Sequence, residues 1–129
     1  MAGLGDSFML PKPGQETEHL WVLITKPDPA THEALMVNLT TQRPHSDRTT
    51  ILNVGEHPFV QKASVIFYAD ARIVDTRLLD AAVQRGACRM HAPFQPPVIT
   101  RIQAGIATSP LTPRRIKTAY AAYTAAGLT

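Results

Sequence analysis

Cysteine is nearly missing from this sequence: Cys88 is the only one among 129 residues. A single cysteine excludes a disulfide within the chain and a zinc site built from cysteines. A lone cysteine is usually a small buried hydrophobe, and this is the role we expect for Cys88.

Long apolar runs are also missing. No run reaches the roughly 18 residues that span a bilayer, and the first residues lack the basic region, apolar stretch and small-residue cleavage site of a secretory signal. We therefore expect a soluble, cytoplasmic protein that does not enter a membrane. Apolar residues make up 44% of the chain and charged residues 18%, so a single folded core is expected.

Four motifs of common enzyme classes do not occur. The chain has no Gly-x-x-x-x-Gly-Lys phosphate loop, no Gly-x-Gly-x-x-Gly, no His-Glu-x-x-His and no Gly-x-Ser-x-Gly elbow. These absences argue against nucleotide hydrolases, dehydrogenases, zinc proteases and α/β-hydrolases.

Carboxylates are missing from the last third of the chain. All ten Asp and Glu residues lie at or before Asp80, and six cations follow: Arg85, Arg89, Arg101, Arg114, Arg115 and Lys117. With a net charge of +3 and a pI near 9.4, this basic block favours an anionic partner, of which nucleic acid is the commonest. The alternative is a solvated helical surface whose arginines pair with N-terminal acids.

Runs of strand length and strand composition fill the first part of the chain. Proline, glycine and aspartate separate them, as is typical of strands joined by tight loops. The runs are 7–10, 19–25, 34–40, 49–54 and 64–68, the last running on through 71–74. They predict a small antiparallel barrel or half-barrel.

Helical periodicity begins after Asp75. One helix is expected to end near Gly86, a second to carry Val98 to Ile106, and a third to start at Pro113 with Thr112 as its cap. The sequence therefore predicts a single domain over 1–129, mainly β, with a β-barrel body over 1–75 and a helical, basic C-terminal layer of two or three α-helices over 76–129.

Polar residues gather where the predicted strands end. Metal-free RNA cleavage needs a group that takes a proton from the ribose 2′-hydroxyl, a group that protonates the leaving oxygen, and a donor or cation for the phosphate. Histidine, arginine and hydroxyl side chains can fill these roles near neutral pH. The candidates are His19, Thr40, Thr41, Arg43, His45, Asp47, Arg48, His57, Ser64 and Tyr68.

Simpler roles exist for several of these residues. His19 and Thr40 could be partly buried residues whose polar atoms bond to the backbone. His45, Asp47 and His57 do not predict a metal site, because neither local spacing presents two ligands on one face of a regular element. Phe59, in the turn after Gly55, is expected to plug the end of the barrel.

Two arginines begin the third predicted helix. Arg114 and Arg115 lie in its first turn, where the helix dipole already creates positive potential and cations are mildly destabilising. An RNA phosphate docked at that end would explain them. The alternative is that both side chains extend into water.

The order of these motifs resembles the MazF/PemK-like endoribonuclease toxins of bacterial toxin-antitoxin modules, which have an SH3-like barrel. The resemblance spans roughly residues 3–107. Gly5-Asp-Ser-Phe8 is similar to the opening Gly-Asp and first strand, residues 19–24 to the second strand, and residues 36–42 to the strand that ends in Thr. The stretch 64–78 is similar to the Ser-Val-apolar-apolar segment that leads into a helix.

The resemblance implies a catalytic arginine at the start of the second strand and a hydroxyl at the end of the next. Thr40 matches the hydroxyl, with Thr41 a one-residue alternative, and His19 occupies the arginine position. His19 then acts as acid or base and Thr40 bonds the scissile phosphate. Groove contacts to RNA are assigned to Arg43, Arg48, His57, Arg114 and Arg115.

The resemblance also implies partners. It predicts a homodimer with single-stranded RNA in a groove, an antitoxin protein that occupies this groove, and no metal or other cofactor. The third helix lies beyond the usual end of the family, where it would enlarge the dimer contact, hold the partner, or cover one side of the barrel. The alternative function is a non-catalytic SH3-like barrel that binds nucleic acid or a protein partner.

Overall fold

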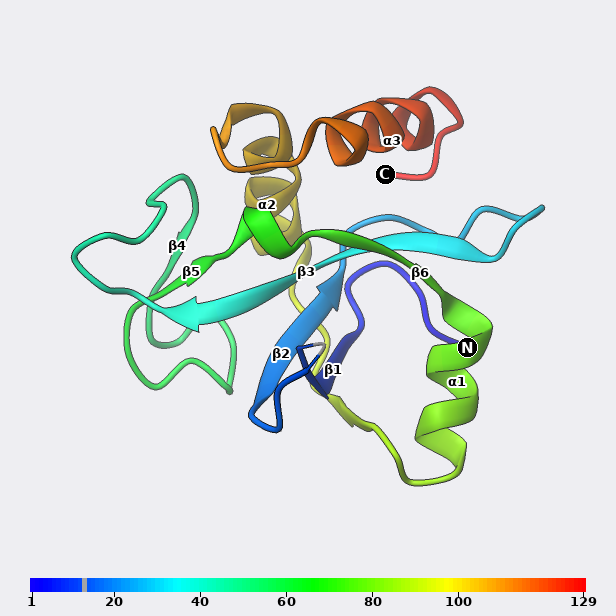
Figure 1. Ribbon diagram of the computed structural model, residues 1–129, viewed down its shortest axis with the longest axis horizontal. Helices are drawn as coiled ribbons and strands as arrows, with labels where there is room; N and C mark the ends of the chain where they lie inside the picture. The colour runs from blue at the N-terminus through cyan, green and yellow to red at the C-terminus, as the bar shows by residue number, and fades with distance from the viewer. Residues whose placement is uncertain (13) are drawn as a thin grey trace.

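The computed structural model describes residues 1–12 and 14–129, and Figure 1 shows their arrangement. A twisted antiparallel sheet forms the centre of the fold, and helices pack on it. The strands are β1 (Ser7–Pro11), β2 (Glu18–Leu23), β3 (Glu33–Thr41), β4 (Ile51–Leu52), β5 (Ser64–Ile66), β6 (Arg72–Asp75) and β7 (Arg89–His91). The helices are the short 3-10 turn η1 (Tyr68–Asp70), α1 (Thr76–Gln84), α2 (Pro96–Thr108) and α3 (Arg114–Ala125).

Strand β3 organises the sheet. It pairs with β2 along one edge, while its other edge pairs with β6 near its start and with β5 near its end. The strand order is β4-β5-β3-β2-β1-β7, with β6 beside β3. In the part of the chain that is described, the end strands β4 and β7 do not pair with each other, so the sheet is not a closed barrel. The expectation of a mainly β protein with C-terminal helices is confirmed, with one seven-stranded antiparallel sheet and three α-helices.

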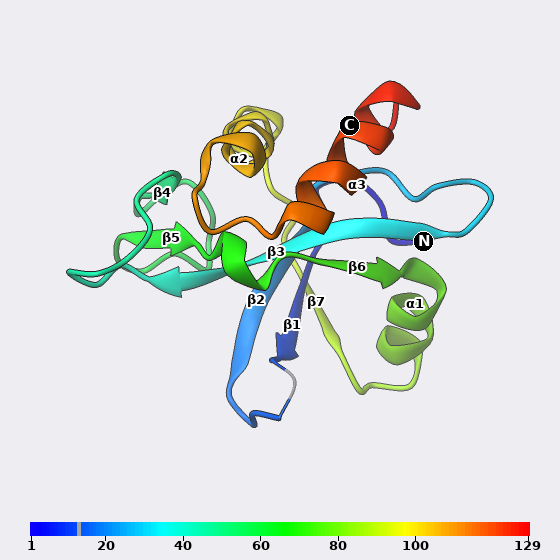
Figure 2. The same ribbon diagram turned by 45° about the horizontal axis from the view of Figure 1, so that its top comes forward.

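Both faces of the central strands are covered. Figure 2 shows α2 and α3 over one face of the sheet and α1 on the other side. The first face packs Leu20, Val22, Leu35, Val37 and Leu39 against Ile102, Ile106 and Ile116 of the helices. The second packs Phe8, Trp21, Leu23 and Met36 against Leu79 and Cys88. This two-sided burial explains why residues 20–25 and 34–39 are almost continuously apolar.

A buried polar contact fixes α2 on the sheet. The Tyr68 hydroxyl donates to the carbonyl oxygen of Ile102 at 2.8 Å and lies 2.7 Å from the Thr50 hydroxyl. Burial raises the pKa of Tyr68 to about 12. Gly105 makes room for this ring, because a Cβ there would lie 1.9 Å from the Tyr68 oxygen. Tyr68, expected at the rim of the barrel, is therefore a fully buried part of the core.

Strand β7 was not predicted. It falls inside 76–129, where only helices were expected, and pairs with β1 so that Ser7 faces His91 and Met9 faces Arg89. Three residues are too few to show a period of two, and the strand forms only because β1 offers an open edge. Arg89 is thereby brought to the sheet.

The predicted cap of α3 is wrong by one residue. Pro113 is the N-cap, with extended backbone angles (φ −57°, ψ 142°), and the helix begins at Arg114. Thr112 is buried, and its hydroxyl has no hydrogen-bond partner among the described residues. At the other end, Gly127 follows the helix with positive φ, as expected for a stop.

The strand expected over 49–54 is shorter than predicted. Only Ile51 and Leu52 pair as β4, while Arg101 of α2 contacts Glu56 and the Ile51 carbonyl. The strand expected over 64–74 is interrupted by η1, which separates β5 from β6. Within the described residues, no helix is both long and apolar enough to cross a membrane.

Candidate functional site

A hollow lies where β2 begins and β3 ends. Trp21 of β2 pairs with Asn38 of β3, so extending this antiparallel register by two residues places His19 beside Thr40 on the same face of the sheet. The residues that line the hollow, which we call the His19 hollow, are Glu18, His19, Leu39, Thr40, Thr41, Arg43, Phe59 and Ser64. Five candidates from the sequence, His19, Thr40, Thr41, Arg43 and Ser64, are thus brought together.

The reactive groups of the His19 hollow differ in their accessibility. His19, Thr40 and Thr41 are half-buried, and Arg43 is exposed. Within the described residues, the His19 imidazole and the Thr40 hydroxyl form no hydrogen bond, so both remain available to a ligand. Ser64 is different, because its hydroxyl donates to the carbonyl oxygen of Lys62 at 3.0 Å.

Glu18 adds a carboxylate that the sequence analysis did not single out. It lies next to His19 in the chain, lines the same hollow, and pairs with Arg89 of β7 at 3.0 Å. The hollow therefore offers an imidazole, a carboxylate, hydroxyls and the Arg43 guanidinium, and Arg89 is held at its margin through Glu18. Only the pairing of β7 with β1 revealed the position of Arg89.

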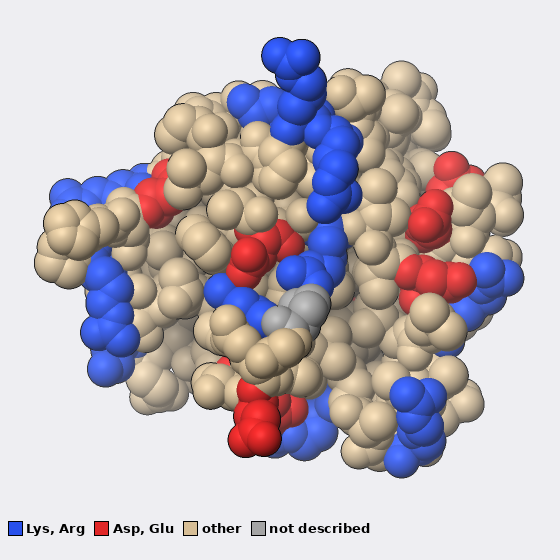
Figure 3. All heavy atoms as spheres, viewed as in Figure 1, with Lys and Arg blue, Asp and Glu red and all other residues tan. Residues whose placement is uncertain are grey.

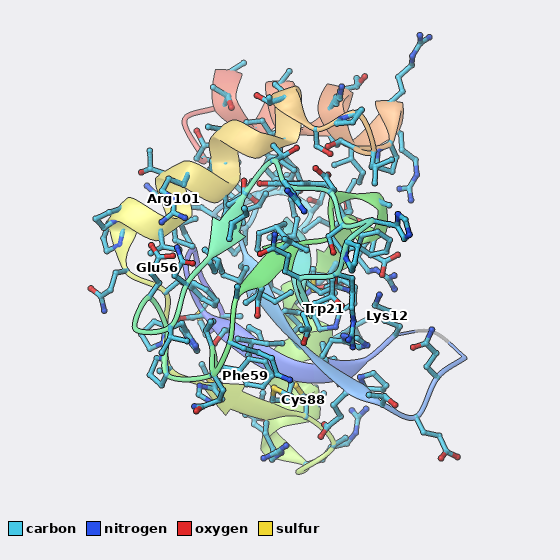
Figure 4. The ribbon with its side chains drawn as sticks, turned by 90° about the vertical axis from the view of Figure 1, so that its left-hand side faces the viewer. Lys12, Trp21, Glu56, Phe59, Cys88 and Arg101 are labelled. Atoms are coloured by element: carbon cyan, nitrogen blue, oxygen red, sulfur yellow. The ribbon has the colours of Figure 1, made fainter. Side chains whose placement is uncertain are left out.

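Phe59 forms one wall of the hollow. The residue is 36% exposed, and its ring is nearly perpendicular to the His91 ring, with 5.8 Å between the ring centroids. Phe59 is labelled in Figure 4, on the loop between β4 and β5. The expected plug of the barrel end is therefore a partly exposed aromatic surface beside polar groups.

His57 is buried behind this wall. Its Nε2 donates to the Ala92 carbonyl oxygen at 2.7 Å, and its Nδ1 accepts from the Phe59 N–H at 3.0 Å. The His57 ring stacks on the Phe94 ring, with 4.2 Å between the ring centroids. Burial lowers the pKa of His57. Because both ring nitrogens are engaged, His57 positions the Phe59 loop and does not line the hollow.

The other predicted RNA contacts lie outside the His19 hollow. Arg48 borders a separate depression with Thr50 and Arg101. Arg115 lines another, with Asp70 and Arg72. Arg114 is exposed at the start of α3.

Asp47, next to Arg48 in the chain, has a structural role. Its carboxylate accepts hydrogen bonds from Ser109, after α2, and from Thr49. Burial alone would raise the pKa of Asp47, but these hydrogen bonds outweigh burial and hold it below its ordinary value. Among the described residues, no three His, Cys, Asp or Glu side chains are grouped to hold a metal ion.

A scan against protein-family models finds no family that matches the chain, and a search of curated proteins finds no matching sequence. The function must therefore be argued from the chemistry of the site. The His19 hollow combines an imidazole, a carboxylate, hydroxyls and guanidinium groups, the set that metal-free phosphoryl transfer requires.

Proposed function

We propose that this protein is a MazF-like toxin with an SH3-like fold, a metal-independent endoribonuclease that cuts single-stranded RNA. The observation that carries the proposal is the convergence of His19, Thr40 and Arg43 in one hollow. Thr40 matches the hydroxyl position of the MazF/PemK-like family, His19 stands where that family has a catalytic arginine, and Arg43, just after the strand that carries Thr40, can supply the permanent cation.

The proposed reaction is an internal transfer at the phosphate. The ribose 2′-oxygen forms a bond to phosphorus and loses its proton, while the bond from phosphorus to the 5′-oxygen breaks and that oxygen gains a proton. His19 and Glu18 are the two groups of the hollow that can exchange these protons. The products are a 2′,3′-cyclic phosphate and a 5′-hydroxyl.

Two other side chains serve the crowded phosphate. The Thr40 hydroxyl donates a hydrogen bond to a non-bridging oxygen, and the Arg43 guanidinium stabilises the added negative charge. A permanent cation is needed because His19, unlike arginine, offers no fixed pair of parallel donors. Phe59 supplies an aromatic surface on which an unpaired base can stack.

The test is cleavage of a long RNA by the purified protein in EDTA. We expect cleavage products with 5′-hydroxyl ends. We expect His19→Ala to cut at least about 100-fold more slowly, as is usual for the loss of an acid-base group, and Thr40→Ala to cut at least about 100-fold more slowly because a donor to the phosphate is lost. His45→Ala is the matched control, because His45 is an exposed histidine outside the hollow. Absence of cleavage, or equal rates for parent, His19→Ala and Thr40→Ala, would refute the catalytic assignment.

Expression in a bacterium gives a second readout. A toxin arrests growth, and the arrest should be relieved by His19→Ala but not by His45→Ala. The proposal includes a homodimer and an antitoxin protein that occupies the hollow. Co-expression with the product of a small neighbouring reading frame should then restore growth.

A second candidate function is a non-catalytic barrel that binds nucleic acid or a protein partner. It is favoured by the cations outside the hollow, namely Arg48, Arg114 and Arg115, which can hold an anion without chemistry. This function predicts binding that weakens with salt and no cleavage product.

A further inference from the structure

A second depression lies at the β6 edge of the sheet, between α3 on one face and Arg72, which pairs with Met36 and so lies on the same sheet face as Trp21 and His19. It is lined by Asp70, Arg72, Arg115 and the small or apolar residues Ala69, Ala71 and Ile73, and we call it the Arg72 depression. Figure 3 shows cationic side chains running in a column from the helical layer down the middle of this view of the molecule, with a carboxylate beside them.

Register relates the depression to the hollow. His19 and Trp21 lie two residues apart on β2, and so point to the same side of the sheet about 7 Å apart. The Arg72 guanidinium lies 4.6 Å from the centre of the Trp21 ring, and Arg72 pairs with Met36 of β3. A single strand of nucleic acid that enters the His19 hollow can therefore continue over Arg72.

The Arg72 guanidinium is held in place before any ligand binds. Trp21 supports its face, and its Nε donates to the Asp70 carbonyl oxygen at 3.3 Å. No hydrogen bond engages its two terminal amino groups within the described residues. A guanidinium fixed in this way presents two parallel donors, which fit two oxygens of one phosphate.

The carboxylate in the depression is already neutralised. Asp70 pairs with Lys12 at 2.7 Å and accepts a hydrogen bond from the Asn38 amide at 3.2 Å. The Lys12 ammonium is further placed over the Phe67 ring, 4.7 Å from its centre. The positive charge of Lys12 thus offsets the negative charge of Asp70, and the positive charges of Arg72 and Arg115 remain available to bind an anion. Figure 4 shows Lys12 and Trp21 on one side of the molecule and the Glu56–Arg101 pair on the other.

We infer that the Arg72 depression binds a backbone phosphate of the RNA substrate, next to the phosphate that is cut, with Arg72 and Arg115 as the direct contacts. The choice of RNA as ligand rests on the proposed function. The site itself rests on the supported guanidinium, the neutralised carboxylate and the position of Arg72 on the sheet face of the His19 hollow.

The test separates binding from cleavage by using a single-stranded RNA with 2′-O-methyl riboses, which cannot be cut at the 2′-oxygen. Fluorescence anisotropy gives its Kd as a function of salt. We expect Arg72→Gln and Arg115→Gln each to raise Kd about tenfold, the usual loss for one charge-assisted hydrogen bond. Each should also reduce the slope of log K against log salt by about 0.7, the value for one phosphate of a single strand.

Two further variants control for the loss of positive charge alone. Arg72→Lys keeps the charge but loses the paired donors, so its affinity should fall while its salt slope stays near the parent value. Arg85→Gln, an exposed arginine after α1, is the matched control for net charge and should leave Kd within about twofold of the parent value. Thermal unfolding of Arg72→Gln checks that the support on Trp21 is not needed for folding.

The possible results are distinguishable. If the parent cuts RNA but the Arg72 and Arg115 variants bind the uncut analogue as tightly as Arg85→Gln, the phosphate site is refuted and the proposed function stands. If the parent binds the analogue and loses affinity as described but cuts no RNA, the site stands and the proposed reaction fails. No binding by the parent would refute the site.

Discussion

Thr112 shows how a residue with a strong local preference can serve another purpose. A threonine before Pro113 and a predicted helix has the pattern of an N-cap. Its side chain instead points into the protein, where the residue is only 6% exposed and the hydroxyl has no partner among the described residues. The residue is therefore buried without capping the helix.

This position gives a prediction that separates the two roles. Replacing Thr112 with Val keeps the shape and removes the hydroxyl, so we expect the free energy of unfolding to rise by about 1 kcal/mol, because a buried polar group without a partner is lost. Loss of a cap would instead lower it by about 1 kcal/mol. Urea denaturation measures the difference.

Thr112→Ser is the matched control. It keeps the hydroxyl and removes the buried methyl group, so we expect it to lower the free energy of unfolding by about 1 kcal/mol. A stable Thr112→Ser protein together with a destabilised Thr112→Val protein would show that the hydroxyl caps the helix in solution.

At the scale of an element, the loop between β4 and β5 depends on one histidine. His57 joins this loop to the segment after β7, through the Ala92 carbonyl, and fixes the backbone of Phe59. Ser7 of β1 donates to the same Ala92 oxygen at 2.6 Å. The wall of the His19 hollow is therefore tied to the edge of the sheet by contacts that need a neutral imidazole, since Nδ1 must accept a hydrogen bond.

The dependence on a neutral imidazole predicts how stability changes with pH. Burial, and the His91 ring whose centroid is 5.1 Å away, lower the pKa of His57 below its ordinary value of 6.5. As pH falls through 6.5, the unfolded chain takes up a proton at this residue before the folded protein does. The contribution of His57 to the free energy of unfolding is thus fully present above pH 6.5 and should be lost as the pH falls below 6.5.

Chemical denaturation at several pH values measures this effect. His57→Gln should be less stable at pH 7 and should lose much of the pH dependence, whereas His45→Gln, at an exposed position, should keep it. The lowered pKa values of Asp47, Glu56 and Asp75 act only below their ordinary values of 3.8 to 4.5, outside this window. An unchanged slope in His57→Gln would assign the pH dependence to another group.

At the scale of the molecule, α3 completes the core. Ile116 is fully buried and belongs to the cluster of β2, β3 and α2, while Tyr120 and Tyr123 are partly buried against it. Of the three roles considered for the third helix, covering one side of the sheet is therefore the one that the packing fulfils.

The packing predicts a large cost for truncating Ile116. We expect Ile116→Ala to lower the free energy of unfolding by about 3 kcal/mol, the typical cost of removing a large buried aliphatic side chain. Thr118→Ala, at an exposed position of the same helix, should change it by less than about 0.5 kcal/mol. Equal stability of parent and Ile116→Ala would mean that α3 is dispensable for the core and is held by a partner.

Much of the fold follows from local sequence patterns. The central strands β2 and β3 are long apolar runs bounded by proline, glycine and aspartate. After Asp75 the spacing of apolar residues changes to the helical period, which predicts α1, α2 and α3. The meeting of His19 with Thr40 could also be predicted, because one residue begins a strand and the other ends the next. Antiparallel pairing brings such positions together.

Tertiary structure alone decided the remaining features. Strand β7 forms by pairing with β1, Tyr68 is buried because Gly105 leaves room for its ring, and His57 faces inward because Ala92 offers an acceptor. Arg72 gains its fixed orientation from Trp21 and Asp70, and lies in one depression with Arg115, which is more than forty positions away in the chain. Local patterns record which residues prefer water or a strand, whereas the partner of a polar or charged group is set by distant segments that only the folded chain brings together.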